Sequence, residues 1–544
     1  MTPMIQNTSP VAMRDAVSDQ VVEWLWQHLS RDAHLSADSR RVTADGGFFA
    51  RAGRRSTDQP AYIAQAITAG AKAVVLDAGD DATQVTEISA AVPTLAVPQL
   101  GRRVGMIASA FYGRPSFSLQ LVAVTGTNGK STVTAATAFA LARCGITAAA
   151  IGTLGYAIFP ANCPRDFSPI WRDDLTGGLT TPDPADLQRL LRELQKQSVT
   201  AVALEASSVG IVQGRLSGCA IKVAAFINLS HDHLDLHGSM QDYAHAKALL
   251  FQAESLASVV INTNDQFADL MWRSIATRVQ RIAVGDQPPS NADAVLRAVL
   301  LEPTEQGVQF ELEGTGKAQK LTGPVSLPVH GQHNVENALI VAGCLLALKI
   351  NGTDVRAQLG EFHLPAGRLQ RIARDQGQAG PLAYVDYAHS PEALARVLEA
   401  LRPLAVRREG RLICVFGCGG DRDAGKRPLM GEIAARLADH VVLTSDNPRS
   451  EPADRILNQI ADGVPAALAA KVIKIEDRGQ AIQSAITQAT QHDVVLIAGR
   501  GHEQIQVMGD QSIRFNDAVH AEQAIQAWCA RATSASAQGV ACPS

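Results

Sequence analysis

The chain has 544 residues, which is too long for one hydrophobic core and predicts about three or four domains. Its net charge of −4 leaves no general basic surface, so binding to nucleic acid is not expected. No apolar run reaches the length of about 18 residues that would predict a membrane span. The eight scattered Cys include no CxxC pair, which is typical of reduced thiols in a cytoplasmic protein.

Residues 1–116 are predicted to form a smaller α/β domain. After a loose leader over residues 1–20, a helix near residues 63–69 accompanies the apolar strands AKAVVLD and PTLAVP. Ser39 stands in a polar stretch, SRR, which from its pattern alone fits an ordinary turn. The Gly and Pro of FYGRPS, residues 111–116, predict a linker.

The central segment, residues 117–364, begins with a phosphate-binding loop. The apolar run from Leu121 to Val124 predicts a buried strand, and a Gly-rich turn and a helix to Arg143 follow it. Backbone N–H groups at the start of such a helix can surround phosphate oxygens. Lys130 can reach the β- and γ-phosphates, and the Ser131 hydroxyl can ligate Mg²⁺. The loop is a shortened variant, GTNGKS, because Val124 stands where the common pattern has its first Gly. The alternative is a Gly-rich turn with a surface lysine.

Three further apolar strands in this segment, VTAVALEAS, IKVAAFINLS and ASVVINTND, alternate with helical patterns. That alternation predicts a doubly wound parallel sheet. Short alternating strands within residues 290–330 predict a small antiparallel sheet on this domain, and a helix is expected over residues 334–349.

Two strand ends of the central segment carry metal-binding side chains. One ends in Glu205 and the other in NLSHDHLDLHG, which contains His233. A carboxylate beside a phosphate loop can complete a Mg²⁺ shell with Ser131. Zinc hydrolysis is disfavoured, since neither Cys partners nor HExxH spacing accompanies the histidines, and solvated loop residues are the simpler alternative. Lys247 stands in a helical pattern and by itself fits a surface lysine.

The third segment, residues 365–544, starts at a hinge in PAGRLQRI and contains four strands. Polar, Gly-rich residues follow each strand in PLAYVDYAHSP, RLICVFGCGGDRD, HVVLTSDNPRS and DVVLIAGRGHE. Because sites in open α/β sheets form outside the carboxyl ends of the strands, these residues predict one site. The tail after Ala530 is expected to be disordered.

A pocket for an amino acid is the favoured interpretation of these strand ends. Arg422 and Arg449 offer forks of donors that match a carboxylate. Asp446, Asn447 and Glu503 would add an anionic face for an ammonium group. Ordinary surface ion pairs remain the alternative. The expected fold is therefore α/β in three domains: a smaller N-terminal domain, a central P-loop-type doubly wound parallel sheet and a C-terminal Rossmann-like sheet.

Ten motifs carry a resemblance to a known family over residues 36–520. In chain order they are GTNGKS, TTPDP, EASSVGIVQGRL, NLSHDHLDLHG, HGQHNVENALIVAG, PAGRLQRI, VDYAHSPEAL, GCGGDRDAGKRP, SDNPRSE and AGRGHE. The chain resembles the Mur ligases, most closely the tripeptide-forming members that add meso-diaminopimelate. The DNPR stretch, residues 446–449, is the mark of those members as opposed to lysine-adding ones.

The resemblance implies an activity and its substrates. The family uses ATP to join an amino acid to UDP-N-acetylmuramoyl-L-alanyl-D-glutamate, through an acyl phosphate, in peptidoglycan precursor synthesis. ATP and Mg²⁺ are the implied cofactors, with meso-diaminopimelate as the second substrate. A cytoplasmic monomer without a membrane span is expected.

The resemblance also implies a role for individual residues. Catalytic roles fall to Lys130, Glu205, His233 and Lys247. ATP contacts fall to Gly126, Thr127, Asn128, Gly129, Lys130, Ser131, Thr132, Asn334 or Asn337, Arg368 and Asp386. Magnesium ligands would be Ser131, Glu205, His233 and Lys247, the last as a carbamate. Ser39 would lie near the uridine end, and the muramoyl peptide would meet Thr180, Thr181, Ser207, Gln213 and Arg215. Diaminopimelate would meet Arg422, Asp446, Asn447, Pro448, Arg449, Gly499 and Glu503.

The chain departs from the family pattern at several places. Arg500 stands where many relatives carry Lys, and little effect is expected because the charge is kept. The GGFF stretch, residues 46–49, lacks the usual acidic residue, and residues 159–179 have no assigned role. The rival hypotheses are another Mur enzyme, a folylpolyglutamate synthetase, a P-loop motor or signalling NTPase and, least favoured, a non-enzymatic binding module. The separate N-terminal domain and DNPR argue against the folate enzyme, and the clustered Arg, Asp and Glu argue against a motor.

Overall fold

The computed structural model describes residues 15–51, 59–79, 84–88, 90–230, 234–372 and 380–537. They form two compact units. The first unit takes the described parts of Met1–Val299, Leu312–Gly323 and Glu336–Glu361, and the second takes those of Leu300–Glu311, Pro324–Val335 and Phe362–Ser544. The division into three domains at residues 116 and 364 stays a prediction.

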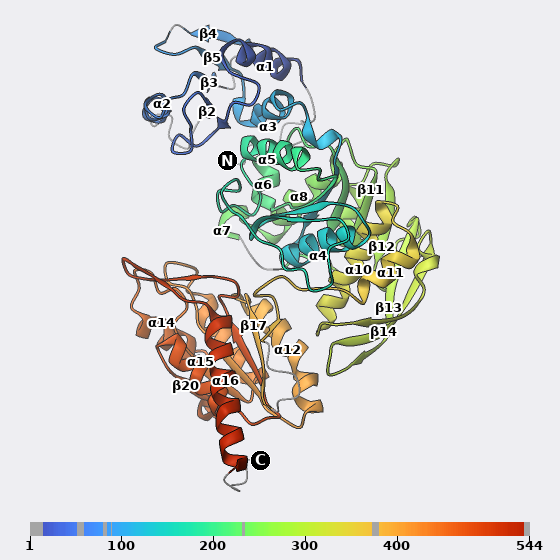
Figure 1. Cartoon of the computed structure of the whole chain (residues 1–544), viewed down its shortest axis with the longest axis vertical. Helices are drawn as coiled ribbons and strands as arrows, with labels where there is room; N and C mark the ends of the chain where they lie inside the picture. Colours follow the sequence, from blue (N-terminus) through green and yellow to red (C-terminus); the bar gives the residue numbers. More distant parts are fainter. Residues whose placement is uncertain are drawn as a thin grey trace. The chain divides into compact units, whose positions relative to one another are not determined.

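The N-terminal part of the first unit is a five-stranded sheet with helices on it (Figure 1). The strand order is β1-β2-β3-β5-β4, parallel except for β4. The strands are β1 (Leu35–Ser36), β2 (Gly47–Ala50), β3 (Ala73–Asp77), β4 (Thr86–Ile88) and β5 (Thr94–Val97). The helices are α1 (Ala16–His28), α2 (Gln59–Thr68) and α3 (Leu100–Phe111). Val21 and Leu25 of α1, Phe49 of β2 and Val104 of α3 share one buried core, so helices and strands pack here in the expected α/β manner.

A ten-stranded sheet follows, in the order β15-β14-β13-β12-β11-β10-β6-β9-β7-β8. Its strands are β6 (Gln120–Thr125), β7 (Ala148–Gly152), β8 (Gly155–Phe159), β9 (Ala201–Glu205), β10 (Ile221–Phe226), β11 (Ser258–Asn262), β12 (Gln280–Val284), β13 (Ala294–Pro303), β14 (Val308–Gly316) and β15 (Gly323–Leu327). From β7 to β12, through β9, β6, β10 and β11, neighbouring strands are parallel, as expected. The separate small sheet expected within residues 290–330 is wrong: its strands form, but β13 pairs with β12 and extends the central sheet.

The helices of this part are α4 (Lys130–Arg143), α5 (Pro184–Lys196), α6 (Ser208–Val212), α7 (Leu234–His237), α8 (Met240–Ala248), α9 (Ala268–Arg273), α10 (Gln332–Ala347) and α11 (Gly352–Leu359). This part also contains three short 3₁₀ helices, which are η2 (Pro115–Phe117), η3 (Leu249–Gln252) and η4 (Gln319–Leu321). The expected linker at residues 111–116 thus runs from the end of α3 into η2. Leucines of α5 pack with Leu121 and Ala123 of β6, which places α5 on one face of the sheet.

The second unit contains a six-stranded sheet in the order β16-β17-β21-β18-β19-β20, parallel except for β16. The strands are β16 (Gln370–Arg371), β17 (Leu382–Asp386), β18 (Leu412–Phe416), β19 (His440–Leu443), β20 (Val472–Lys474) and β21 (Val494–Ala498), and the antiparallel pair β22 (Ile505–Met508) and β23 (Gln511–Arg514) follows. The helices are α12 (Pro391–Arg407), α13 (Lys426–Leu437), α14 (Ala453–Ala461), α15 (Arg478–Thr487) and α16 (Asp517–Ala537), with a 3₁₀ turn η5 (Ala466–Lys471).

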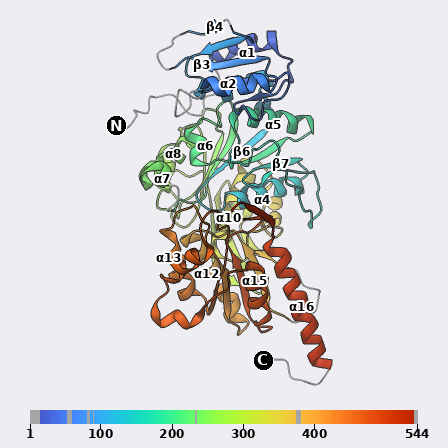
Figure 2. The same ribbon diagram turned by 90° about the vertical axis from the view of Figure 1, so that its left-hand side faces the viewer.

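Two apolar clusters show that helices cover both faces of this sheet. Leu398 of α12 and Met430 of α13 pack on one face, and Ile482 of α15 and Ile525 of α16 pack on the other (Figure 2). All four expected strands are present, and their polar successors follow the carboxyl ends. The sequence prediction of a disordered tail after Ala530 is wrong as far as residue 537, because α16 continues to that residue.

Candidate active site

The phosphate loop leaves the carboxyl end of β6, an interior strand of the ten-stranded sheet. β6 is buried from Leu121 to Thr125, and α4 starts at Lys130 after Gly129, whose φ of 89° is left-handed. Nearly all of α4 is buried because its Ala and Thr side chains are small enough to pack closely. The N-terminus of a buried helix therefore adjoins the loop, where N–H groups and the helix dipole favour a phosphate.

A second loop, which follows β10, holds the phosphate loop in shape. Asn228 Oδ1 accepts from the backbone N–H of Asn128 at 2.9 Å, and its Nδ2 donates to the Asn128 carbonyl at 3.1 Å. The backbone N–H of Ser230 donates to Thr127 Oγ1 at 3.0 Å. Sequence reasoning missed Asn228 and Ser230, although both belong to the strand-end motif NLSHD.

Two lysines meet at one carbonyl of the phosphate loop. Lys130 Nζ donates to Gly126 O at 3.1 Å and to Thr127 O at 2.9 Å. Lys247 Nζ donates to Gly126 O at 2.9 Å, with the Tyr243 ring 4.5 Å away, and the residue is 1% exposed. The surface-lysine alternative for Lys247 is therefore wrong, since α8 buries this side chain beside the loop.

Glu205 and Ser131 form an oxygen-rich pair at the end of β9. Ser131 Oγ donates to Glu205 Oε1 at 2.8 Å, and the backbone N–H of Thr153 donates to the same oxygen at 3.0 Å. Thr153 Oγ1 donates to Glu205 Oε2 at 3.1 Å. Gly152 makes room for this carboxylate, because a Cβ there would lie 2.0 Å from Oε1. Hydroxyl and carboxylate oxygens fit Mg²⁺, which prefers hard oxygen ligands.

The predicted muramoyl-peptide residues continue from Glu205. Thr180 Oγ1 lies 3.1 Å from Thr153 Oγ1, and Thr181 Oγ1 donates to the Glu205 carbonyl at 2.8 Å. The backbone N–H of Ser207 donates to Thr181 Oγ1 at 2.9 Å, and Ser207 Oγ caps α6. These hydroxyls form one hydrogen-bonded group directly beside the Ser131–Glu205 pair.

Arg215 links this group to a large pocket. Its Nη1 donates to the Thr181 carbonyl at 2.7 Å and its Nη2 to Gln213 Oε1 at 2.7 Å. Burial lowers the pKa of the Arg215 guanidinium. Both Gln213 and Arg215 line the pocket, so the polar path from Glu205 ends there.

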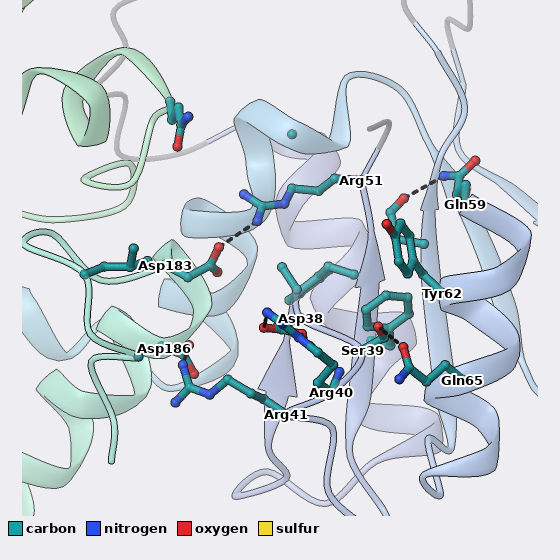
Figure 3. Close-up of a pocket in the computed structure, with 18 of the residues that line it drawn as sticks. Asp38, Ser39, Arg40, Arg41, Arg51, Gln59, Tyr62, Gln65, Asp183 and Asp186 are labelled. Atoms are coloured by element: carbon teal, nitrogen blue, oxygen red, sulfur yellow. Dashed lines mark hydrogen bonds and ion pairs between the residues drawn. The ribbon is translucent and has the colours of Figure 1, made fainter. Parts of the chain in front are cut away.

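The pocket has a volume of about 840 Å³ and is lined by residues of the N-terminal part and of the stretch from Gly177 to Arg215 (Figure 3). Ser39 lies in its wall and donates to Gln65 Oε1 at 2.7 Å. Arg51 Nη2 donates to Asp183 Oδ2 at 2.7 Å across the two parts. Burial raises the pKa of Asp183, although Arg51 opposes that shift. The structure thus brings Ser39 and the two predicted residues Gln213 and Arg215 around one cavity.

Of the other residues predicted to bind the nucleotide or the metal, some lie beside the phosphate loop and others do not. The Asn337 amide closely approaches the loop, since a Cβ on Gly129 would lie 2.6 Å from its Oδ1. Asn334 instead donates from Nδ2 to the His330 carbonyl at 2.9 Å. His233 lies outside the described residues, so its predicted role as a metal ligand stays a prediction.

In the second unit, Asp386 and Arg368 lie at the end of β17. Asp386 accepts from the backbone N–H groups of Leu369 and Ala388, each at 2.7 Å. Burial raises the pKa of its carboxyl group, and the positive charge of Arg368 opposes the rise. The Arg368 guanidinium stacks 4.6 Å from the Tyr387 ring centre. The two predicted nucleotide contacts therefore share one strand end.

Several residues predicted for the amino-acid pocket lie close together after the ends of β19 and β21. Asn447 Nδ2 donates to Glu503 Oε2 at 2.8 Å, and its Oδ1 accepts from Val507 N at 2.9 Å. Gly499 lies against Asp446, with a built Cβ 2.7 Å from Asp446 Oδ2. Burial raises the pKa of Glu503, and the Asn447 amide opposes the rise by stabilising the carboxylate.

Arg449 belongs to the same group, whereas Arg422 is less constrained. Arg449 Nη1 donates to the Gly420 carbonyl at 2.7 Å, and its φ of 50° is left-handed. Its backbone pairs with β22 at Met508, so the β22–β23 pair supports this corner. Pro448 is buried and Arg422 is exposed. The cationic and anionic side chains expected for an amino-acid pocket thus follow the ends of β21, β18 and β19, which are consecutive strands of the sheet.

Arg500 is a residue whose contacts the sequence did not reveal. Its Nη2 donates to the Ile505 carbonyl at 2.8 Å and to the Phe515 carbonyl at 3.4 Å, and its Nε lies 3.6 Å from Glu503 Oε2. Burial lowers its pKa. A forked guanidinium makes these contacts together, so Arg and Lys are not equivalent here.

Among the residues that the structure describes, none of the helices combines the length and the hydropathy that a membrane span requires. Nor do the described residues include a group of three or more His, Cys, Asp or Glu side chains placed to bind a metal ion.

Comparison with known proteins gives consistent matches. The profile of the Mur ligase middle domain matches residues 124–345, and that of the Mur ligase, glutamate ligase domain matches residues 367–501. A relative from Ralstonia nicotianae named UDP-N-acetylmuramoyl-L-alanyl-D-glutamate–2,6-diaminopimelate ligase is 38% identical over 528 residues, which cover 95% of this chain and 97% of the relative. A relative of the same name from a Janthinobacterium species is 40% identical over 510 residues, covering 93% and 96%.

A solved structure of an enzyme with that name is also similar. It is 33% identical to this chain and superposes with a TM-score of 0.62, covering 91% of this chain and 94% of its own. The sequence and the fold are therefore both similar to proteins of that name, over more than nine-tenths of this chain and of each relative.

Proposed function

The chain belongs to the Mur ligase family, and on this premise we propose that it joins meso-diaminopimelate to the D-glutamate of UDP-N-acetylmuramoyl-L-alanyl-D-glutamate with the use of ATP. Relatives covering more than nine-tenths of the chain carry the name of that ligase. The observation that carries the proposal is the polar path from Ser131 and Glu205, through Thr181 and Arg215, to the pocket of about 840 Å³. Such a path suits a long nucleotide-sugar peptide whose reacting carboxylate lies beside a phosphate loop.

The substrate carboxylate must be phosphorylated before an amine can attack it, because its own oxygen is a poor leaving group. A carboxylate oxygen of the substrate attacks the γ-phosphorus of ATP, and ADP leaves, which gives an acyl phosphate. The amine of diaminopimelate then attacks the acyl carbon, loses a proton and expels inorganic phosphate. The loop N–H groups and Lys130 would stabilise charge on the phosphoryl oxygens during the first step.

Magnesium would be held by Ser131 and Glu205. Their oxygens, 2.8 Å apart, are the donor types this ion prefers. Bound there, Mg²⁺ would neutralise phosphate charge. Lys247 donates to the Gly126 carbonyl as an unmodified lysine, and a role as a metal ligand would require carbamylation, which turns a cation into a carboxylate-like group. We propose that modification for Lys247 and a further ligand role for His233.

The amine substrate would bind in the second unit. Arg449 and Arg422 provide cations for carboxylates, and Glu503 and Asp446 provide anions for ammonium groups. Diaminopimelate carries a carboxylate at the end where lysine has none, so a pocket with two Arg favours diaminopimelate. The reaction would take place in the cytoplasm, where ATP is supplied, and would serve peptidoglycan precursor synthesis. The enzyme would act as a monomer.

The test is an amino-acid panel assayed with ATP and the muramoyl dipeptide. Phosphate release should require both the dipeptide and meso-diaminopimelate, and L-lysine should be used at least about 100-fold less efficiently, because a site built for a polar group rejects a substrate that lacks it. The measurement is kcat/KM from phosphate release, with product mass as a check. Robust ATP turnover with neither substrate would instead favour a P-loop switch protein, and equal use of lysine would contradict the assigned amino acid.

A further inference from the structure

Residues 172–179, which belong to the stretch 159–179 that had no assigned role, form a connection from the pairing with β8 to Thr180 and Thr181. The connection is paired with β8 at its start, where the backbone N–H of Tyr156 donates to the Arg172 carbonyl at 2.7 Å and that of Arg172 donates back at 2.9 Å. At its other end it leads directly into Thr180. Gly177 and Leu179 line the 840 Å³ pocket, so the connection is also a pocket wall.

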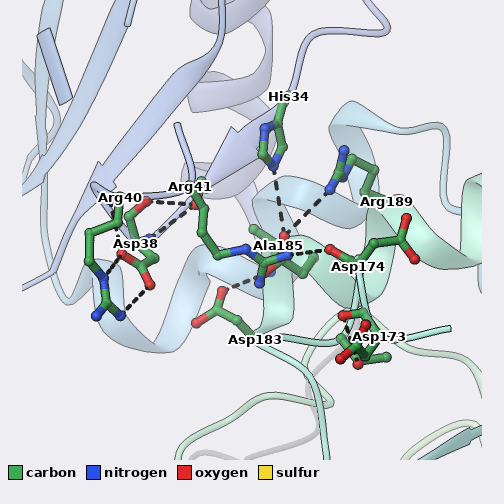
Figure 4. Close-up of polar contacts among 12 residues, drawn as sticks. His34, Asp38, Arg40, Arg41, Asp173, Asp174, Asp183, Ala185 and Arg189 are labelled. Atoms are coloured by element: carbon green, nitrogen blue, oxygen red, sulfur yellow. Dashed lines mark hydrogen bonds and ion pairs between the residues drawn. The ribbon is translucent and has the colours of Figure 1, made fainter. Parts of the chain in front are cut away.

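Arg41 connects this wall to helix α5. Its Nη2 donates to the Asp174 carbonyl at 2.9 Å, and its Nη1 donates to Asp186 Oδ2 at 2.7 Å. The guanidinium also packs against Gly177, where a Cβ would lie 2.6 Å from Nη1. A single fork from the N-terminal part therefore holds both the wall and the first turn of α5 (Figure 4).

Arg41 is the residue that makes the shortest ion pair with the Asp186 carboxylate. The carboxylate is 4% exposed and lies in the first turn of α5. Its Oδ1 makes no hydrogen bond among the described residues, and the nearest cationic groups to it are His34 Nε2 at 3.8 Å and Arg189 Nη2 at 3.9 Å. A buried carboxylate with one strong partner holds that partner firmly, because losing it leaves an uncompensated charge.

We propose that Arg41 is a positioning residue for the muramoyl nucleotide: paired with Asp186, it fixes the wall of residues 172–179 and thereby sets Thr180 and Thr181 for the substrate. This inference rests on the proposed function. Arg41 acts through the wall and not through the reacting atoms. The adjacent Arg40 does not share the role, since it pairs with Asp38 two residues away and is 78% exposed.

The kinetic test compares Arg41→Met, Arg41→Lys, Asp186→Asn and the double variant Arg41→Met/Asp186→Asn. Arg41→Met and Asp186→Asn should each raise the KM for the muramoyl nucleotide about tenfold, which is the usual effect of losing one charge-assisted hydrogen bond. The KM values for ATP and diaminopimelate should change less than twofold. The double variant should be no worse than either single one, because both changes break the same contact. Arg41→Lys should stay impaired, since one ammonium lacks the fork that serves two acceptors.

Lys196→Met is the matched control. Lys196 also lies on α5 and also pairs with the N-terminal part, at 3.3 Å from Asp32, but both side chains are exposed and neither lines the pocket. Its kinetic constants should be those of the unchanged protein. If Arg41→Met raises the KM and Asp186→Asn does not, Arg41 contacts the substrate directly and the positioning role is overturned. Unchanged KM values in both variants overturn it as well.

Hydrogen exchange separates this inference from the proposed function, because it needs no substrate. The backbone N–H groups of Gly177 and Leu179 are bonded within the wall, to the carbonyls of Asp173 and Thr176. Their exchange should quicken about tenfold in Arg41→Met and in Asp186→Asn, and not in Lys196→Met. If the exchange of these two N–H groups is unchanged in both variants, the positioning role is wrong even when the ligase activity is found. If their exchange is faster but no ligase activity is found, only the proposed function is wrong.

Discussion

Glu205 shows how the position of one side chain depends on neighbouring single residues. Its carboxylate is 2% exposed and accepts hydrogen bonds from Ser131 and from the backbone and side chain of Thr153. The carboxylate can occupy this place only because Gly152 has no side chain. Ser131 and Glu205 could be predicted from their motifs. Gly152 and Thr153 could not, because their role arises from the close approach of β7 and β9 in space.

Gly152→Ala should therefore disable the reaction without removing any reacting group. The added methyl would lie 2.0 Å from Glu205 Oε1 and force the carboxylate away from Ser131. We expect kcat to fall about 100-fold, which is the scale of a displacement of about 1 Å in an active site. Saturating assays with all three substrates measure the fall, and a thermal unfolding curve confirms that the variant folds.

The control for that variant is Gly479→Ala in α15. A methyl group there would meet nothing closer than 3.3 Å, so kcat should be unchanged. Full activity of Gly152→Ala would show that Glu205 can work from a different position.

Helices α15 and α16 support the strand ends at which the proposed amino-acid site lies. Arg478, at the start of α15, pairs with Asp517, at the start of α16, through two hydrogen bonds of 2.7 Å, and neither side chain is exposed. Arg478 also donates to the carbonyls of Ala498 and Ser445, which directly precede Gly499 and Asp446. The two helices thus hold the ends of β19 and β21 in place.

Asp517→Asn tests how much this buried ion pair contributes to the free energy of unfolding. Removing one charge of a buried, hydrogen-bonded pair leaves the other uncompensated, so we expect the free energy of unfolding to fall by about 3–5 kcal/mol. Urea denaturation followed by circular dichroism measures the change. The exposed pair of Arg436 and Glu432 offers a comparison, because Arg436→Ala should cost no more than about 0.5 kcal/mol. A similar small loss in Asp517→Asn would mean that the pair adds little.

Strand ends were the most predictable elements, and helix α16 was among the least. β17, β18, β19 and β21 are apolar runs followed by Gly-rich polar residues, a local pattern that predicts their place in a parallel sheet. The tail RATSASA looked disordered because it has few apolar residues. It is helical because α16 is already anchored by Ala521, Ile525 and Trp528, and Ala continues a helix at little cost.

The candidate site was predictable where one motif carries one role, and not where distant segments cooperate. The residues of GTNGKS and DNPR stand in sequence order and could be assigned by resemblance. Asn228 and Arg500 lie within motifs and Arg41 does not, but all three contact partners that the fold brings to them, so the local pattern could not predict these contacts.

At the scale of the whole molecule, the two units carry different halves of the proposed chemistry. The phosphate loop, Glu205, Lys247 and the large pocket belong to the first unit, and Asp446, Arg449 and Glu503 belong to the second. Forming the acyl phosphate requires ATP and the muramoyl dipeptide, whereas only the second step requires the amine. The steps should therefore be separable by mutation.

Arg449→Ala should retain the first step and lose the second. With ATP and the muramoyl dipeptide alone, reversible phosphoryl transfer scrambles oxygen-18 between bridging and non-bridging positions of ATP, and the rate should stay within twofold of the unchanged protein. The kcat/KM for diaminopimelate should fall about 100-fold, the scale of losing an ion-pair partner. Glu205→Gln should lose scrambling and ligation together. Equal losses of both steps in Arg449→Ala would contradict this division.

The position of Trp528 on α16 has an optical consequence. The chain has five tryptophans, and Trp528 is the one in the second unit, buried at 9% exposure with its indole N–H donating to the Ala489 carbonyl at 2.8 Å. Replacing Trp24, Trp26, Trp171 and Trp272 with Phe would leave an emission spectrum that belongs to the second unit alone. The reverse change, Trp528→Phe, would confine emission to the first. The distribution of its tryptophans thus allows the unfolding of each unit to be followed separately in these two variants.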